Sequence, residues 1–113
     1  MPSSWKNNTP PAPPYLAVIF ISKKSSDLDG YTEMDELTMK LAQEQPGFLG
    51  YESCNHNNEG IFISYWKDKA AIENWRINTT HLIAKKMGKT QWYERYLSQI
   101  CEVQQSHEFI KEK

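Results

Sequence analysis

The chain has 113 residues, a length that predicts one domain with a small core. Its formal net charge is -1 with 24% charged residues, so there is no electrostatic basis for binding nucleic acid or an anionic membrane. The two cysteines, Cys54 and Cys101, have none of the spacings of zinc sites, so no metal is expected and both are expected to be unreactive.

No segment of the sequence has the length or pattern of a membrane anchor. The longest apolar run, Tyr15 to Ile21, is too short to cross a bilayer. The N-terminus lacks the charged and apolar regions of a signal peptide. Together with two lone thiols, these features lead us to expect a cytoplasmic protein.

Residues 1–14 form a proline-rich arm with prolines at positions 2, 10, 11, 13 and 14. Prolines at this density disfavour helix and interior strand, so we expect an extended segment. Trp5 leaves two interpretations open. The arm is a loosely packed tail, or Trp5 packs into a groove of its own subunit or of a partner.

The first half of the domain predicts a strand, a helix and a second strand. Residues 15–21 are a continuous β-favouring run that is typical of a central strand. Residues 30–45 have helical periodicity, and Pro46-Gly47 ends that helix. The predicted apolar stripe of this helix is Tyr31, Met34, Leu37, Thr38, Leu41 and Ala42. Residues 48–56 then read as a strand.

The next segment predicts a hairpin and a helix. Asn57 to Gly60 have the composition of a turn, and residues 61–67 return as an antiparallel strand. Asp68 is a candidate N-cap for a helix over 69–77, whose inward face would carry Ala71, Ile72 and Trp75.

The remaining residues predict a second short helix and a long strand. Asn78-Thr79-Thr80 is interpreted as a break before a helix over 81–90. A tight turn is expected at 91–94, a final strand at 95–108 and a charged tail at 109–113.

The predicted order is β-α-β-β-α-(α)-β within residues 15–108. This is an α+β, ferredoxin-like arrangement in which helices cover one face of a four-stranded antiparallel sheet. The other face would expose residues such as Val18, Phe20, Ile63 and Tyr65. An apolar sheet face in a small domain favours burial against a second copy of the chain.

Several motifs point to a known family. Residues 46–52 read Pro-Gly-Phe-Leu-Gly-Tyr-Glu, 63–68 read Ile-Ser-Tyr-Trp-Lys-Asp, and 72–76 read Ile-Glu-Asn-Trp-Arg. They are followed by His81, Ala84, Gly88 and Trp92-Tyr93. Over about residues 15–108 the sequence resembles the antibiotic biosynthesis monooxygenase (ABM) domain, a dimeric α+β barrel family, and within it a subgroup of small bacterial proteins with no settled activity.

The resemblance implies a homodimer formed through the sheet faces, with a long last strand that reaches the partner. It also implies a pocket between the sheet and the helices of each subunit. Some members of the family oxidise aromatic polyketides with dioxygen and no cofactor, and others bind and degrade haem.

Haem chemistry is the less favoured of these activities for this sequence. The haem-binding members use an asparagine on the first strand, a tryptophan on the second helix and a histidine farther along. Trp75 matches the tryptophan, but Lys85 falls near the ligand position and residues 15–21 contain no asparagine. We therefore expect a monooxygenase-like protein without a cofactor, which binds a small aromatic or quinone-like ligand. The alternative is a non-catalytic ligand-binding or stress-response dimer, and whether the chain is an enzyme stays open.

His81 is the candidate base, because an imidazole titrates near neutral pH. The alternative for His81 is a solvated residue in the first turn of a helix. The tryptophans Trp66 and Trp75 are either pocket wall or plain core. The predicted ligand-binding residues are Trp75, Trp66, Asn74, Arg76, Tyr51, Trp92 and Tyr93.

Overall fold

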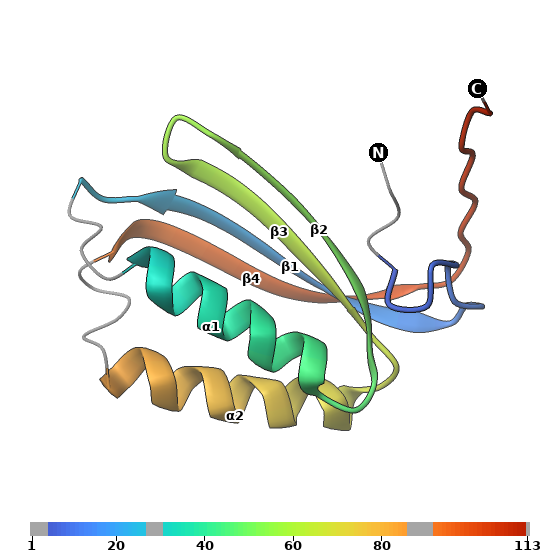
Figure 1. Cartoon of the computed structure of the whole chain (residues 1–113), viewed down its shortest axis with the longest axis horizontal. Helices are drawn as coiled ribbons and strands as arrows, with labels where there is room; N and C mark the ends of the chain where they lie inside the picture. Colours follow the sequence, from blue (N-terminus) through green and yellow to red (C-terminus); the bar gives the residue numbers. More distant parts are fainter. Residues whose placement is uncertain (1–4, 27–30, 86–91, 113) are drawn as a thin grey trace.

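The computed structural model describes residues 5–26, 31–85 and 92–112, and only the backbone at Tyr31, Met34 and residues 80–85. The elements are β1 (Tyr15–Lys24), α1 (Tyr31–Glu44), β2 (Phe48–His56), β3 (Glu59–Trp66), α2 (Lys69–Lys85) and β4 (Tyr93–Val103). The strands form an antiparallel sheet in the order β2-β3-β1-β4 (Figure 1). This confirms the predicted α+β, ferredoxin-like fold.

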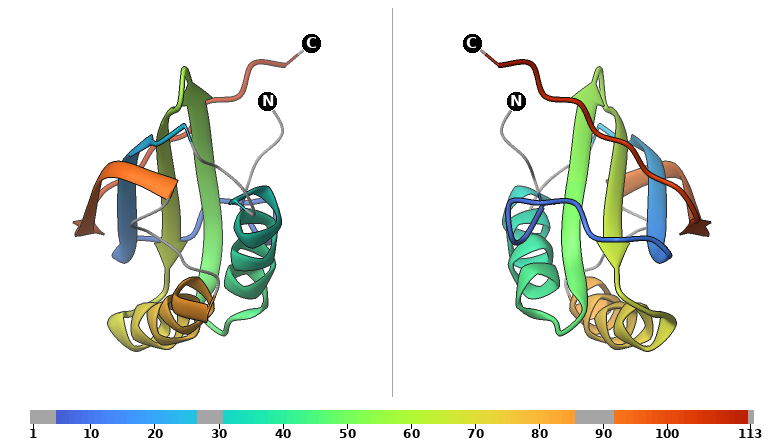
Figure 2. Two further views of the ribbon diagram at one scale, coloured as in Figure 1. Left: turned by 90° about the vertical axis from the view of Figure 1, so that its left-hand side faces the viewer. Right: turned by 90° about the vertical axis from the view of Figure 1, so that its right-hand side faces the viewer.

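The two helices lie side by side and pack near one edge of the sheet. α1 contacts β2, and α2 contacts β3. Figure 2, viewed nearly along the helices, shows α1 beside β2 and β4 at the opposite edge of the sheet. The region over β1 and β4 is therefore left without a tightly packed helix.

Strand register decides which side chains face the helices. Side chains alternate along a strand, and residues directly opposite each other share a face. Val18 and Phe20 line the side that carries the helices. Ile63 lies opposite Ile19, so Ile63 and Tyr65 lie on the other face. The prediction that all four of Val18, Phe20, Ile63 and Tyr65 share the uncovered face is therefore wrong for the first two.

A pair of tryptophans anchors α2 to the sheet. Trp66 is fully buried, and its ring stacks on Trp75 with centroids 5.1 Å apart and an interplanar angle of 30°. Its indole Nε1 donates a hydrogen bond of 2.8 Å to Oγ of the buried Ser64. The core cluster consists of Val18, Ala42, Phe48, Trp66, Ala71, Ile72 and Trp75.

α2 is one continuous helix. The backbone N–H of Ala71 donates to Oδ1 of Asp68 at 2.9 Å, which confirms the predicted N-cap. The helix then runs to Lys85 without the expected break at Asn78-Thr79-Thr80. These residue types lower helix propensity by only fractions of a kcal/mol, about 0.7 each at most, and tertiary packing overrides that. Residues 86–90 of the predicted second helix lie outside the described residues.

The inward face of α1 is rotated from the prediction. Asp35, Thr38 and Met39 line the inner side, and Ala42 is buried, whereas Leu37 is 40% exposed. Positions 35, 38, 39 and 42 do share one helical face. The predicted stripe is right for Thr38 and Ala42, and it missed Asp35 because a polar residue does not fit an apolar pattern.

Two tight connections shape the sheet. Gly47 follows α1 with φ of 87°, and a Cβ there would lie 2.7 Å from Ala71 Cβ. Only glycine meets both demands. The β2–β3 hairpin is a two-residue turn in which Asn57 and Asn58 have φ of 50° and 66°. The turn is shorter than predicted, and Gly60 lies inside β3.

The N-terminal arm packs on its own sheet, on the face away from the helices. The Lys6 N–H donates to the Leu49 carbonyl at 2.9 Å. Trp5 contacts Tyr65 and Tyr15, with ring centroids 4.7 Å and 6.2 Å away. The structure therefore shows Trp5 packed against its own subunit and not in a loose tail.

The C-terminal part differs from the prediction at both ends of its strand. β4 begins at Tyr93, inside the predicted turn, and ends at Val103, five residues before the predicted end at 108. Residues 104–112 extend away from the body without regular structure (Figure 1). Cys54 and Cys101 are both free thiols and exposed, so neither is part of the core. In the described part of the chain, no helix is both long and apolar enough to cross a membrane.

Candidate functional site

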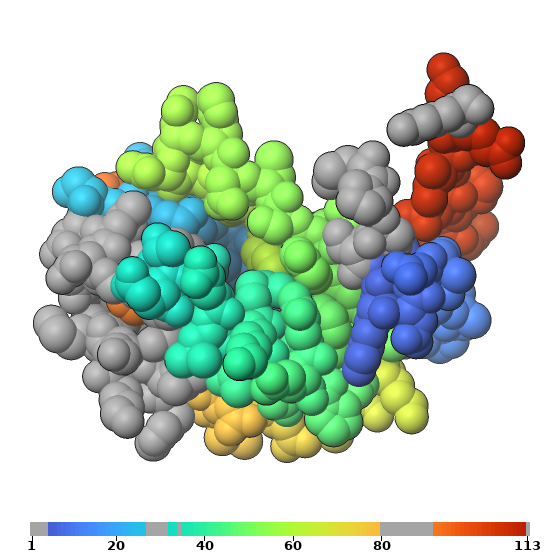
Figure 3. All heavy atoms as spheres, in the orientation of Figure 1, coloured from blue at the N-terminus to red at the C-terminus, as the bar shows by residue number. Residues whose placement is uncertain are grey.

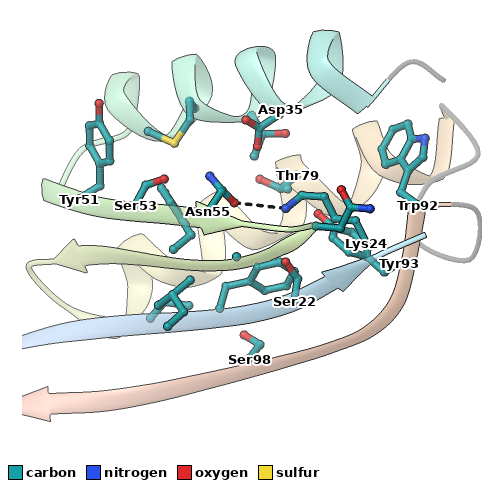
Figure 4. Close-up of a pocket in the computed structure, with 18 of the residues that line it drawn as sticks. Ser22, Lys24, Asp35, Tyr51, Ser53, Asn55, Thr79, Trp92, Tyr93 and Ser98 are labelled. Atoms are coloured by element: carbon teal, nitrogen blue, oxygen red, sulfur yellow. Dashed lines mark hydrogen bonds between the residues drawn. The ribbon is translucent and has the colours of Figure 1, made fainter. Parts of the chain in front are cut away.

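A cavity of about 780 Å³ lies between the helix-bearing face of the sheet and the two helices. Figure 3 shows the surface hollowed between α1 and the β2–β3 hairpin. Figure 4 shows its lining side chains, which converge from β1, β2, β4, α1 and α2. The cavity has the size and partly apolar character of a site for a small organic molecule.

Aromatic rings form much of the wall. Phe20 and Tyr93 both line the cavity and meet edge to face with ring centroids 5.6 Å apart. Phe20 also stacks on Tyr96, which lies outside the lining, at 5.5 Å between centroids. On the other side Tyr51 and Phe62 lie 6.0 Å apart. Rings at these separations hold one another in place, and an aromatic wall of this kind suits a planar ligand.

Trp75 connects this wall to the core. One face of its ring stacks on Trp66, and the residue also lines the cavity while only 9% exposed. Its indole Nε1 has no hydrogen-bond partner among the described residues. The same holds for Oγ1 of Thr79, a cavity-lining residue one helical turn later on α2. A buried polar atom without a partner costs about 1–3 kcal/mol, which a ligand acceptor next to Trp75 would recover.

Polar side chains gather at the hairpin end of the cavity. Lys24 donates a hydrogen bond of 3.2 Å from Nζ to Oδ1 of Asn55 (Figure 4). Ser22, which is buried, lies beside them on β1. All three surround Gly60: a Cβ at that position would approach Asn55 Oδ1, lie 3.1 Å from Lys24 Nζ and lie 3.5 Å from Ser22 Oγ. The missing side chain of Gly60 therefore leaves space for this group.

Asp35 faces the same end of the cavity from α1 (Figure 4). Burial raises the pKa of its carboxyl above the ordinary value of 3.8 because the charged form is poorly solvated. The Lys24 cation opposes this increase, and the Glu36 carboxylate adds to it. The cavity thus has a cation from the sheet and a carboxyl group from the helix at one end.

The structure brings most of the predicted site residues to the cavity. Tyr51, Trp75, Arg76, Trp92 and Tyr93 line it. The Arg76 guanidinium also donates to the Glu73 carboxylate at 3.1 Å on the exposed side of α2.

Three predicted residues have a different status. Trp66 does not line the cavity, because it is buried behind Trp75. Asn74 is exposed on the outer side of α2 and does not line it either. The backbone of His81 lies in α2, but its side chain lies outside the described residues.

Sequence reasoning missed Ser22, Lys24, Asp35 and Asn55. The first strand was predicted to end at Ile21, although it continues to Lys24. Extending the alternation from Val18 and Phe20 places Ser22 and Lys24 on the same face, and this signal was present in the sequence. In the described part of the chain, no group of three or more His, Cys, Asp or Glu side chains could hold a metal ion.

The profile of the antibiotic biosynthesis monooxygenase (ABM) family matches residues 17–86. The chain belongs to this family. This ABM chain is also 45% identical over 100 residues to the uncharacterized protein YqjZ of Bacillus subtilis (strain 168), and the match covers 88% of each chain. The family assignment confirms the resemblance found in the sequence.

Solved structures agree on the fold of this ABM chain. A mutant of SnoaB, a cofactor-independent oxygenase from Streptomyces nogalater, matches with a TM-score of 0.66 and 12% identity over 81% of this chain and 95% of SnoaB. Protein SO0527 from Shewanella oneidensis matches with a TM-score of 0.67 and 8% identity, over 80% of this chain and 91% of its own. At these identities the similarity establishes the fold alone.

Proposed function

We propose that this chain binds a small aromatic or quinone-like molecule in the cavity and oxidises it with dioxygen, without a cofactor. The observation that carries the proposal is the indole donor of Trp75, which has no partner among the described residues and belongs to a residue in the aromatic wall of a cavity of about 780 Å³. Membership of the ABM family and the fold shared with SnoaB, a cofactor-independent oxygenase, support the oxidative part.

The reaction can be written for an anthrone-type ring. A base removes one proton from the ring methylene, and the carbanion passes electrons to dioxygen as a C–O bond forms. The resulting hydroperoxide loses water and leaves a carbonyl. One oxygen atom stays on the ring and the other leaves as water, so dioxygen takes up all four electrons that the carbon loses. The protein supplies a base, a hydrogen-bond donor for the developing oxyanion and a site that excludes water.

Trp75 is the proposed donor to the substrate oxygen, because the residue lines the cavity and its buried Nε1–H has no partner among the described residues. His81 is the proposed base. It is proposed because an imidazole can accept a proton near neutral pH and because its backbone lies in α2, the helix that also carries Trp75. Tyr51 and Tyr93 are proposed to contact the ligand from opposite ends of the cavity (Figure 4).

The functional unit is proposed to be a homodimer that forms through the uncovered sheet face. Ile19 lies opposite Ile63, and the neighbouring row pairs Ile21 with Leu97. Trp5 of the arm covers one end of this face through its contact with Tyr65. The aliphatic rows beside it are left for a second copy of the chain.

The test measures binding and oxygen consumption separately. Purified protein is incubated with anthrone and with a quinol series in air-saturated buffer, and ligand binding is measured in parallel under nitrogen. The proposal predicts saturable binding and oxygen uptake above the buffer rate, with turnover lost and affinity kept in His81→Ala. Binding without oxygen uptake would indicate the non-catalytic ligand-binding or stress-response dimer, and absence of binding across the series would refute the proposal.

A further inference from the structure

We infer that the hairpin end of the cavity is a subsite for a hydroxyl group of the ligand, built from Ser22, Lys24, Asp35 and Asn55 around Gly60. The inference rests on the proposed function, because it presumes that the cavity takes an aromatic molecule. It specifies the chemical class of the ligand. The ligand is a ring that carries a phenol or quinol hydroxyl, in preference to a ring that carries a carboxylate or an ether.

The shape of this end is set by a missing side chain. Gly60 lies in β3, and its φ is not in the left-handed region. Glycine is therefore needed here for its lack of a side chain and not for its backbone conformation. A Cβ there would collide with Asn55 Oδ1 and come within 3.1 Å of Lys24 Nζ. Those two atoms join in a hydrogen bond of 3.2 Å, which fixes the amide and the ammonium at the cavity wall.

The charges at this end select a group that can both donate and accept. Lys24 on β1 presents a cation, which favours a ligand oxygen that accepts. Asp35 on α1 presents a carboxyl group, which favours a ligand hydrogen that is donated. A hydroxyl satisfies both groups, whereas a carboxylate would be repelled by an ionised Asp35 and an ether has no hydrogen to donate.

The electrostatics of Asp35 agree with this assignment. Burial raises the pKa of its carboxyl, and the Lys24 cation acts in the opposite direction, so the two groups interact across the cavity. A carboxylate whose charged form is destabilised by burial gains from a hydroxyl that donates to it. The buried Ser22 provides a further neutral group beside Lys24.

The first experiment compares three ligands with one ring system and different substituents. Equilibrium dialysis at pH 7 measures the Kd of 2-naphthol, 2-methoxynaphthalene and 2-naphthoate for the full chain. We expect 2-naphthol to bind about tenfold more tightly than either of the others, since a hydrogen bond to a charged partner contributes roughly this factor.

The second experiment places the preference at this end of the cavity. Gly60→Ala should fill the subsite, and Lys24→Met should remove its cation. Each should lower the affinity for 2-naphthol to that for 2-methoxynaphthalene, whose own affinity should change by less than about twofold. Lys23→Met is the matched control, because it removes the same charge from the neighbouring residue. The Lys23 side chain is exposed and pairs with Glu94 at 3.7 Å.

The outcomes separate the two proposals. Tightest binding of 2-naphthoate, equal binding of all three ligands, or a 2-naphthol preference that survives in both Gly60→Ala and Lys24→Met would overturn the subsite and leave the aromatic cavity standing. If none of the three binds the wild type, both proposals fail. Should Gly60→Ala not fold, as judged by circular dichroism, Asn55→Ala tests the same contact without adding atoms.

Discussion

The two stacked tryptophans should lose different amounts of stability on the same substitution. Trp66 and Trp75 lie 5.1 Å apart and are both buried, so replacing either by phenylalanine removes the same number of atoms from one region of the core. Their indole N–H groups differ. That of Trp66 donates to Ser64 Oγ at 2.8 Å, and that of Trp75 has no partner among the described residues.

The magnitude follows from the hydrogen bond. Trp66→Phe leaves the fully buried Ser64 hydroxyl without its donor, which costs about 1–3 kcal/mol beyond the loss of packing. Trp75→Phe loses packing but also removes an unsatisfied buried donor, which offsets part of that loss. We therefore expect Trp66→Phe to be less stable than Trp75→Phe by at least about 1 kcal/mol, or about 4 °C in Tm for a domain of this size.

Urea denaturation of both variants measures this difference in the free energy of unfolding. The double variant Trp66→Phe with Ser64→Ala is the control, because removing both partners should recover most of the hydrogen-bond part of the loss. Equal destabilisation by the two single substitutions, or no recovery in the double variant, would refute the reasoning.

Three further predictions address other parts of the molecule. Gly47→Ala should lower stability by about 2 kcal/mol or more, because its φ is 87° and the new Cβ would lie 2.7 Å from that of Ala71; an unchanged midpoint in urea would contradict this. Leu97→Arg should convert a particle of twice the 13.2 kDa chain mass into one of single mass in light scattering, and a wild type that is already monomeric would refute the proposed dimer. Asp35→Asn should raise Tm at pH 7, because a carboxyl whose pKa is raised by burial disfavours the fold while it is ionised. This advantage should shrink as the pH falls through the raised pKa and be gone below 3.8, and a variant less stable at pH 7 would exclude this.

The sequence predicted the order of strands and helices because each has a local signal. The apolar run after Tyr15, the Asp68 cap and the Pro46-Gly47 stop all lie where the structure has an element boundary. The helix break predicted at residues 78–80 is absent from α2. That prediction rested only on the weak helix propensity of these residues. Packing of Trp75 and Ile72 against the sheet holds the preceding turns of the helix, and the helix continues.

The candidate site was predicted on its aromatic side and missed on its polar side. Trp75 and Tyr51 stood out by residue type and family motif. Lys24 and Asn55 are 31 positions apart, and only the register of β1, β3 and β2 brings them together at Gly60. Asp35 was missed because a polar residue on the inner face of a helix breaks the apolar pattern that identifies that face.

The central claim is that the cavity receives an aromatic ligand whose oxygen accepts a hydrogen bond from Trp75. Titration of the full chain with naphthalene-2,6-diol, followed by the indole N–H signals in a ¹H–¹⁵N spectrum, tests it directly, with Trp75→Phe to assign the signal. The diol is used because its second oxygen is left for Trp75 when the first hydroxyl occupies the subsite at Gly60. We expect the Trp75 signal to move downfield in a saturable way, while that of Trp66, whose N–H is already donated to Ser64, stays in place. An unmoved Trp75 signal at ligand concentrations that saturate binding would contradict the claim.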